Sequence, residues 1–315
     1  MTLVVARQVD NEIFVIGDTK FTADAEDCKS EASQYIGGLK VVLLTPGLCV
    51  AFAGNVQDAK NAIQGIYDEG VNLFDKNLVL EYFLGHHQRS LQRDKDNGAT
   101  FVVAIIVGSN EQSGSFVKEI FRIADSKIHW ENQTAHIGDG DAFDSFQKVI
   151  HGGLQNSKKP TFEIASLGER ERPQFNISLS AAMRAMQDVI DNPQIPSVDG
   201  YRTVVISDDD QFRYVEYVQV NGRAISIQNA PGSPVSYGGA AEGSDIKHVG
   251  MFAATGHGVF PVYSITGGFG LIYHPEKCFE PKSISSCSLE EFRVKVEAQI
   301  LAAHERVLNY QSRFF

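Results

Sequence analysis

Short hydrophobic runs come in pairs at the start of the chain, which is typical of β-hairpins. The runs "TLVVARQ" (2–8) and "IFVIGDT" (13–19) flank a turn with the sequence Asp-Asn. The segment "KVVLLTPGLCVAFAG" (40–54) repeats this arrangement around a Pro-Gly turn. The first 54 residues therefore predict two hairpins, with the first strand beginning at the second residue of the chain.

The spacing of apolar residues then changes to a helical period, which predicts helices over 57–73 and 77–93. A nearly continuous β-branched run, "ATFVVAIIVG" (99–108), predicts a buried strand. Beyond it we expect strands over 115–125 and 127–132, helices over 141–153 and 176–191, and a strand over 201–207. Antiparallel strands with separate pairs of helices favour an α+β domain of two stacked sheets with helices outside, occupying residues 1–210.

Residues 211–315 differ in pattern and are interpreted as a C-terminal extension of unknown role. The segment 212–228 predicts a hairpin around Asn221-Gly222, and a stretch rich in Gly, Ser and Pro follows from 231 to about 270. The chain closes with an amphipathic helix whose capping box is formed by Ser288 and Glu291.

Composition narrows the class of protein. The chain has 315 residues, of which 43% are hydrophobic and 21% charged, as in ordinary globular proteins. A net charge of -11 argues against nucleic acid or a membrane surface as partner. We expect neither an export signal nor a membrane span. The four cysteines, at 28, 49, 278 and 287, lack metal-binding spacing and predict reduced thiols in a cytoplasmic protein without a metal site.

Thr2 is the first candidate for chemistry. If Met1 is removed, the chain begins with a residue that has both a free α-amine and a hydroxyl group. The amine can act as the base that activates the hydroxyl as a nucleophile. Its ordinary pKa of about 7.7 to 8.0 leaves a sizeable neutral fraction near neutral pH. A strand would hold such a terminus in place, whereas most chain ends fray.

The residues that accompany Thr2 resemble the proteasome β-type subunits and their bacterial relatives, the N-terminal-nucleophile (Ntn) threonine hydrolases. The resemblance lies in the start at Thr2, in "GDTK" with Asp18, in "LKVVLL" with Lys40 and in "AFAGNVQDA" with Gly54 and Asp58. It extends over about residues 2–207 and is most specific over the first 60.

The resemblance implies a four-layer αββα sandwich and a role for each matching residue. Thr2 would be the nucleophile and its amine the general base. Lys40 would lower the pKa of the N-terminal group as an ammonium, and Asp18 would orient Lys40. The backbone N–H of Gly54 would stabilise the oxyanion.

Three positions depart from the family pattern. Asp139, in "IGDGDAF", stands where the family has a serine that hydrogen-bonds toward the amine, and we expect its carboxylate to lie near that amine. Lys20 replaces the usual arginine. The later Asp-x-x-Ser-Gly motif has no unique match among Asp191, Ser197 and Asp199, of which we favour Asp199 because a glycine and a strand follow it.

Other polar motifs favour structural interpretations. Adjacent His86 and His87 point in different directions on a helix and would chelate poorly. His257 is expected in a flexible loop, and the acidic run 207–211 in a solvated turn.

The sequence therefore predicts a threonine-type amide hydrolase, in particular a peptidase, that forms an acyl-enzyme at Thr2. The proposed catalytic set is Thr2, Asp18, Lys40, Gly54, Asp139 and Asp199. A hydrolase of a small amide on the same fold, an inactive ring or scaffold protein, and a ligand-binding module remain alternatives. We expect no cofactor and no nucleic-acid or membrane partner. The expected partners are a peptide or small-amide substrate and further copies of the chain, and the sequence identifies no unfoldase or regulator.

Overall fold

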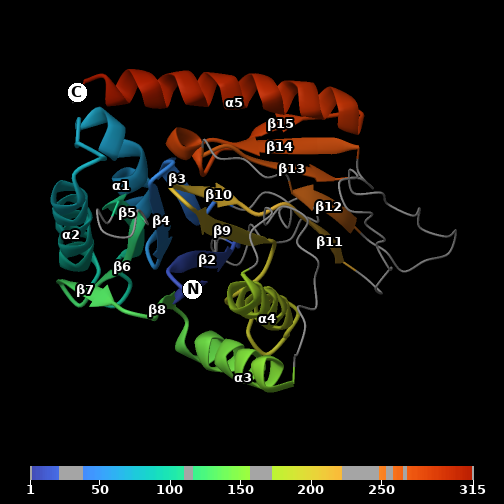
Figure 1. The fold of residues 1–315 in the computed structure, drawn as a ribbon, viewed down its shortest axis with the longest axis horizontal. Coiled ribbons are helices and arrows are strands. Elements are labelled where there is room, and N and C mark those ends of the chain that lie inside the picture. Colours follow the sequence, from blue (N-terminus) through green and yellow to red (C-terminus); the bar gives the residue numbers. More distant parts are fainter. Residues whose placement is uncertain are drawn as a thin grey trace, which may run out of the picture.

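The computed structural model describes most of the chain as a mixed α/β protein with antiparallel sheets (Figure 1). The residues it describes are 2–20, 38–109, 116–156, 172–221, 248–252, 258–264 and 268–313. Within these ranges there are three five-stranded sheets, in which all neighbouring strands are antiparallel. The expected α+β class is therefore confirmed.

The first sheet contains the N-terminal hairpin at its centre, in the order β10-β9-β2-β1-β8. Its strands are β1 (Leu3–Val9), β2 (Glu12–Asp18), β8 (Thr134–Gly138), β9 (Arg202–Asp208) and β10 (Gln211–Tyr214). The hairpin turn between β1 and β2 has positive φ at Asp10 and Asn11, as two-residue hairpin turns require. Because β1 and β2 lie between other strands, the start of the chain is fixed in the interior of the sheet.

The second sheet has strands in sequence order, β3-β4-β5-β6-β7. They are β3 (Val41–Thr45), β4 (Leu48–Ala53), β5 (Thr100–Ser109), β6 (Phe116–Ala124) and β7 (Lys127–Glu131). Every residue of β3 and β4 is buried, which agrees with their continuous apolar sequence.

Two helix pairs accompany these sheets. Helices α1 (Val56–Asp68) and α2 (Lys76–Arg93) contact the second sheet, and α4 (Pro173–Ile190) contacts the first sheet and packs with α3 (Gly140–Asn156). The two sheets also contact each other through β1 and β8 of one and β4, β5 and β6 of the other. Their buried apolar side chains form one continuous core.

The C-terminal part of the chain adds a third sheet and a long helix, which lies along one edge of the molecule in Figure 1. The strands are β11 (Tyr217–Asn221), β12 (His248–Phe252), β13 (Phe260–Ser264), β14 (Phe269–Tyr273) and β15 (Lys282–Ile284), with a 3-10 turn, η2 (Pro275–Lys277). Helix α5 (Leu289–Gln311) begins with the predicted capping box and packs on this sheet through a small second core that contains Phe292 and Val296.

The third sheet is not isolated from the rest of the molecule. Phe260, Tyr273 and Cys278 belong to the main core, and the ring of Phe260 lies 4.8 Å from that of Tyr214. Strand β10 follows residue 210 yet pairs with β9 in the first sheet. The boundary between 210 and 211 stays a prediction.

Some expected features fall outside the described residues. The hairpin at Asn221-Gly222 lies largely there, and the strand before it, β11, pairs with β12. Most of the Gly-rich stretch, His257 and Cys28 lie there as well. Among the helices of the described ranges, none combines the length and the apolar character needed to cross a bilayer.

Candidate active site

Thr2 and Asp18 lie side by side at the ends of neighbouring strands, because the β1–β2 hairpin brings residue 2 next to residue 18. The Thr2 hydroxyl donates a hydrogen bond to Asp18 Oδ1. The same carboxylate oxygen accepts the backbone N–H of Leu3 at 3.1 Å, and Oδ2 accepts the N–H of Lys20 at 3.1 Å. The Asp18 carboxylate is thus held by the backbone on both sides.

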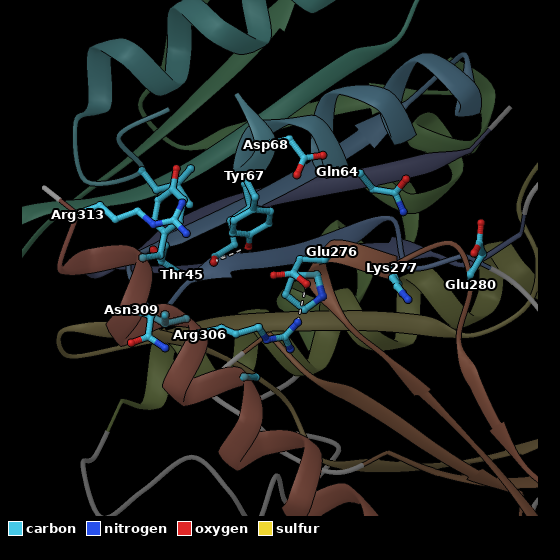
Figure 2. Close-up of a pocket in the computed structure, with 16 residues that line it drawn as sticks. Thr45, Gln64, Tyr67, Asp68, Glu276, Lys277, Glu280, Arg306, Asn309 and Arg313 are labelled. Carbon is cyan, nitrogen blue, oxygen red and sulfur yellow. Dashed lines mark hydrogen bonds and ion pairs between the residues drawn. The ribbon is translucent and has the colours of Figure 1, made fainter. Parts of the chain in front are cut away.

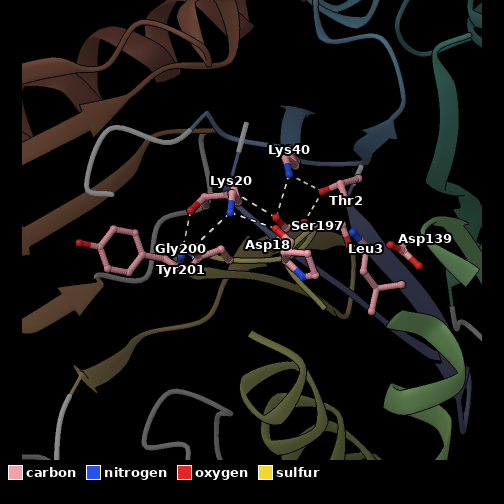
Figure 3. A network of polar contacts seen from close by, with 12 residues as sticks. Thr2, Leu3, Asp18, Lys20, Lys40, Asp139, Ser197, Gly200 and Tyr201 are labelled. Atoms are coloured by element: carbon pink, nitrogen blue, oxygen red, sulfur yellow. Dashed lines mark hydrogen bonds and ion pairs between the residues drawn. The ribbon is translucent and has the colours of Figure 1, made fainter. Parts of the chain in front are cut away.

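Lys40 reaches this pair from the second sheet, as Figure 3 shows. It immediately precedes β3, and its Nζ donates to the Thr2 hydroxyl oxygen and to Asp18 Oδ2, the latter at 2.8 Å. Thr2, Asp18 and Lys40 are 3%, 0% and 2% exposed. Three residues from three separate segments therefore form one buried polar cluster where the two sheets meet.

Burying charged groups in this cluster costs free energy. Burial lowers the pKa of the Lys40 ammonium from its ordinary value, although the neighbouring Asp18 carboxylate acts in the opposite direction. An apolar pair of similar volume would often stabilise a fold as well or better. A buried Lys–Asp pair that shares a threonine hydroxyl is consequently a candidate for function, since perturbed ionisable groups concentrate at such sites.

The backbone of Thr2 is fixed by the strand on its other side. The Thr2 carbonyl accepts the backbone N–H of Asp139 at 2.7 Å, at the end of the β1–β8 pairing. Gly138 has a φ of 103°, and a Cβ at this position would lie 1.9 Å from the Thr2 carbonyl oxygen. Only glycine allows β8 to approach Thr2 this closely.

The Asp139 side chain caps helix α3. Its Oδ1 accepts the backbone N–H groups of Asp141 and Ala142 at 2.9 and 3.1 Å, and its Oδ2 accepts the Ser197 hydroxyl at 2.5 Å. Burial tends to raise the pKa of this carboxyl, but these three hydrogen bonds and the positive charge of the chain's N-terminus together outweigh it and lower the pKa. Among the described residues, the hydrogen-bond partners of this carboxylate do not include the Thr2 nitrogen, and the expected contact with a free Thr2 amine stays a prediction.

Gly54 follows β4 and begins the turn into α1. It has a φ of 85°, and a Cβ here would lie 2.2 Å from the carbonyl oxygen of Gly98. Two residues earlier, Phe52 donates its N–H to the carbonyl of Lys40 at 3.1 Å, so this turn lies beside the lysine. Within the described part of the chain, the Gly54 N–H has no acceptor.

Asp58, which belongs to the same sequence motif, stabilises the turn at Gly54 through its side-chain contacts. Its carboxylate accepts the Ser90 hydroxyl and pairs with Arg93 Nη2 at 2.9 Å. The Ser90 oxygen accepts the N–H of Ala99 at 2.8 Å, next to Gly98. Asp58 thereby links α1, α2 and the start of β5 around Gly54.

The three candidates for the later motif lie in different places. Ser197 contacts Asp139, whereas the favoured Asp199 accepts the Lys20 N–H through its carbonyl at 3.2 Å and lies 3.4 Å from Lys20 Nζ through its carboxylate. Asp191 accepts a hydrogen bond from Gln187 at the end of α4. Sequence reasoning did not single out Ser197, since its contact with Asp139 joins segments 58 residues apart.

The remaining polar motifs have structural partners. His87 is buried between the carbonyl of Ala99 and the N–H of Ser126. Asp208, in the acidic run, pairs with Arg172 and Arg213 at the β9–β10 turn. In the described ranges no group of His, Cys, Asp and Glu side chains could hold a metal ion, and Cys49, Cys278 and Cys287 are buried free thiols.

Comparison with known proteins finds similar solved structures. No protein-family profile matches the chain, and no curated protein matches it in sequence. The chain is similar to eukaryotic HslV from Trypanosoma brucei, known from a crystal structure, with a TM-score of 0.41 and 12% identity. The alignment covers 65% of this chain and 98% of the HslV chain. A likeness of this degree says nothing about the activity of this chain.

Proposed function

We propose that this protein is an N-terminal threonine amide hydrolase, in particular a peptidase, with Thr2 as its nucleophile. The observation that carries the proposal is the buried cluster of Thr2, Asp18 and Lys40, in which the lysine ammonium contacts the threonine hydroxyl. The helix–sheet contacts described above support an αββα sandwich as its fold.

In the proposed reaction, removal of Met1 frees the Thr2 amine, which accepts the hydroxyl proton as Oγ1 attacks the substrate carbonyl carbon. The C–N bond breaks, the proton passes to the leaving amine, and the acyl group remains as an ester on Oγ1. Water, deprotonated by the same amine, then hydrolyses the ester. Lys40 stabilises the negative charge that develops on Oγ1, and Asp18 keeps Lys40 charged and oriented.

The Gly54 N–H is the proposed donor to the oxyanion. It has no acceptor within the described residues and lies on the turn beside Lys40. Loss of one such donor typically costs about 2.7 to 4 kcal/mol of transition-state stabilisation. Asp139 and Ser197 are assigned a positioning role, because the Asp139 N–H holds the Thr2 carbonyl and its carboxylate bonds the serine.

Replacement of the nucleophile tests the proposal. Thr2→Ala should abolish hydrolysis of a peptide and small-amide library, and Lys40→Ala should do nearly the same, because the two groups act as one unit. Thr2→Ser keeps the hydroxyl and serves as the matched control that retains activity. Hydrolysis by Thr2→Ala within about tenfold of the wild type would refute the assignment.

We also propose that the chain self-associates through α5. The outer face of this helix bears Val294, Leu301 and Leu308, spaced by seven residues and 60%, 66% and 50% exposed. These residues lie opposite the face that packs on the third sheet, and α5 runs along one edge of the molecule (Figure 1). Apolar residues on both sides of a helix are typical of a helix with a second packing partner.

A further inference from the structure

The C-terminal extension meets the residues just before β3, where Lys40 lies. The backbone N–H of Leu39, one residue before the lysine, donates to the carbonyl of Cys278 at 2.9 Å. The 3-10 turn just before Cys278, η2, contacts both α1 and β3. The segment after β14 is therefore anchored beside the candidate active site.

The next residue of this segment, Phe279, packs on an aromatic ring that neighbours Lys40. Its ring lies 5.3 Å from that of Phe52. Phe52 and Lys40 stand opposite each other one residue beyond the last β3–β4 pair, Val41 and Ala51, since the Phe52 N–H donates to the Lys40 carbonyl. Residues directly opposite in an antiparallel pair project from the same face of the sheet. The Phe52 side chain thus lies next to that of Lys40, with Phe279 against it.

The same segment is also tied to the helix that follows Gly54. The Glu280 carboxylate pairs with Lys60 Nζ at 2.6 Å, which joins the extension to the first turns of α1. Of the two rings, Phe52 is 1% exposed while Phe279 is only partly buried. Phe279 is therefore the more exposed ring of this pair.

We infer that the extension forms one wall of the substrate site, and that Phe279 limits the size of the substrate side chain next to the scissile bond. This inference rests on the proposed function and adds its substrate class: amides of residues with small apolar side chains. Phe279 is a specificity residue in this inference, because its ring packs on Phe52, the residue opposite Lys40.

A peptide series with Ala, Leu or Phe on the acyl side of the scissile bond tests this inference. Phe279→Ala should raise the kcat/KM of the Phe peptide relative to the Ala peptide by about tenfold or more, since a change of even one methylene in an apolar pocket alters selectivity by 10- to 200-fold. Phe279→Leu should give a smaller change. Phe269→Ala, at the opposite end of β14, is the control and should leave the ratio unchanged.

Binding of the same peptides to Thr2→Ala protein, followed by fluorescence anisotropy, separates this inference from the proposed function. If Phe279→Ala shifts the ratio of the affinities for the Phe and Ala peptides, the inference that Phe279 limits the substrate side chain is supported even if no hydrolysis occurs. If Thr2-dependent hydrolysis occurs and the Phe/Ala peptide ratio is unchanged, the proposed function stands and the inference about Phe279 is wrong. An equal loss for all peptides also overturns it, and so does an absence of both binding and hydrolysis.

Discussion

Lys40 and Asp18 illustrate, at the scale of single residues, what a buried ion pair requires. Both side chains are almost completely buried, and each has polar partners besides the other: the Thr2 hydroxyl for both, and two backbone N–H groups for Asp18. Taking either charge away leaves the other without its counter-ion, although both side chains are almost completely buried. Such a loss costs more than the intact pair contributes.

The stability of Lys40 variants follows from this. Lys40→Met removes the ammonium and leaves the buried Asp18 carboxylate unpaired, so we expect the free energy of unfolding to fall by about 3 to 5 kcal/mol. The double variant Lys40→Met/Asp18→Asn should lose less than the sum of the two single variants. Urea denaturation measures all three. Additive losses would show that the pair does not interact as described.

A second prediction concerns Asp139 and pH. Its pKa is lowered in the folded protein, so its contribution to stability is complete above the ordinary pKa of about 3.9 and disappears as the pH falls through the lower, folded value. Asp139→Ala also removes the α3 cap and should cost about 1 kcal/mol near pH 7, and less once the pH falls below the ordinary pKa of the carboxyl.

Asp139→Asn is the matched control, because it keeps an acceptor for the helix cap and removes the charge. Its stability near pH 7 should stay closer to that of the wild type. A loss in Asp139→Ala that is the same at pH 3 and pH 7 would contradict the described role of the carboxylate.

Sequence reasoning identified residues at this scale where a local motif marked them. Thr2, Asp18 and Lys40 each sit at the end of a predicted strand, and the structure brings their side chains together; their catalytic roles stay predictions. Ser197 was left unresolved among three candidates because its partner, Asp139, lies in a distant segment. The orientation of Asp139 toward the α3 cap was missed, although the following helix start is the signal that could have indicated it.

At the scale of elements, the close contact between β1 and β8 fixes the position of Thr2. Gly138→Ala would place a Cβ 1.9 Å from the Thr2 carbonyl oxygen at a φ of 103°, so the strands must separate and Thr2 must move. We expect loss of hydrolytic activity together with a destabilisation of about 1 kcal/mol or more, measured by peptide assays and thermal unfolding.

Gly140→Ala provides the control on the other side of Asp139. A Cβ at Gly140, the first residue of α3, meets no atom within 4 Å, so this variant should keep full activity and at least wild-type stability. Equal behaviour of the two glycine variants would show that β8 does not position Thr2.

Elements with strong periodicity were predicted well from the sequence. The helices α1 to α5 and the strands β1 to β7 and β9 all occur close to their expected ranges. Strand β8 was not recognised because it is a five-residue strand with alternating exposure before a glycine-rich turn. The third sheet was missed because its short strands β13 to β15 lie in a stretch rich in glycine and serine, where pairing with neighbouring strands outweighs local propensity.

At the scale of the whole molecule, the outer face of α5 predicts an assembly. Leu301→Glu places a charge in the middle of the exposed apolar row and should convert an oligomer into a monomer. Ala302→Glu adds the same charge at an exposed neighbouring position of α5, beside this row, and should leave the assembly intact. Light scattering at micromolar concentration measures both. A wild-type mass of about 35 kDa, that of the single chain, would refute self-association.

The central claim is that Thr2 is a reactive N-terminal residue, and mass spectrometry after exposure to an acylating β-lactone tests it most directly. The lactone ring opens when a nucleophilic hydroxyl attacks it, so the acyl group stays on the reactive residue. We predict that the N-terminal peptide begins at Thr2 and carries one acyl group, and that Lys40→Ala protein remains unmodified. A peptide that retains Met1 and bears no acyl group, or a modification at another residue with Thr2 unchanged, would contradict the account.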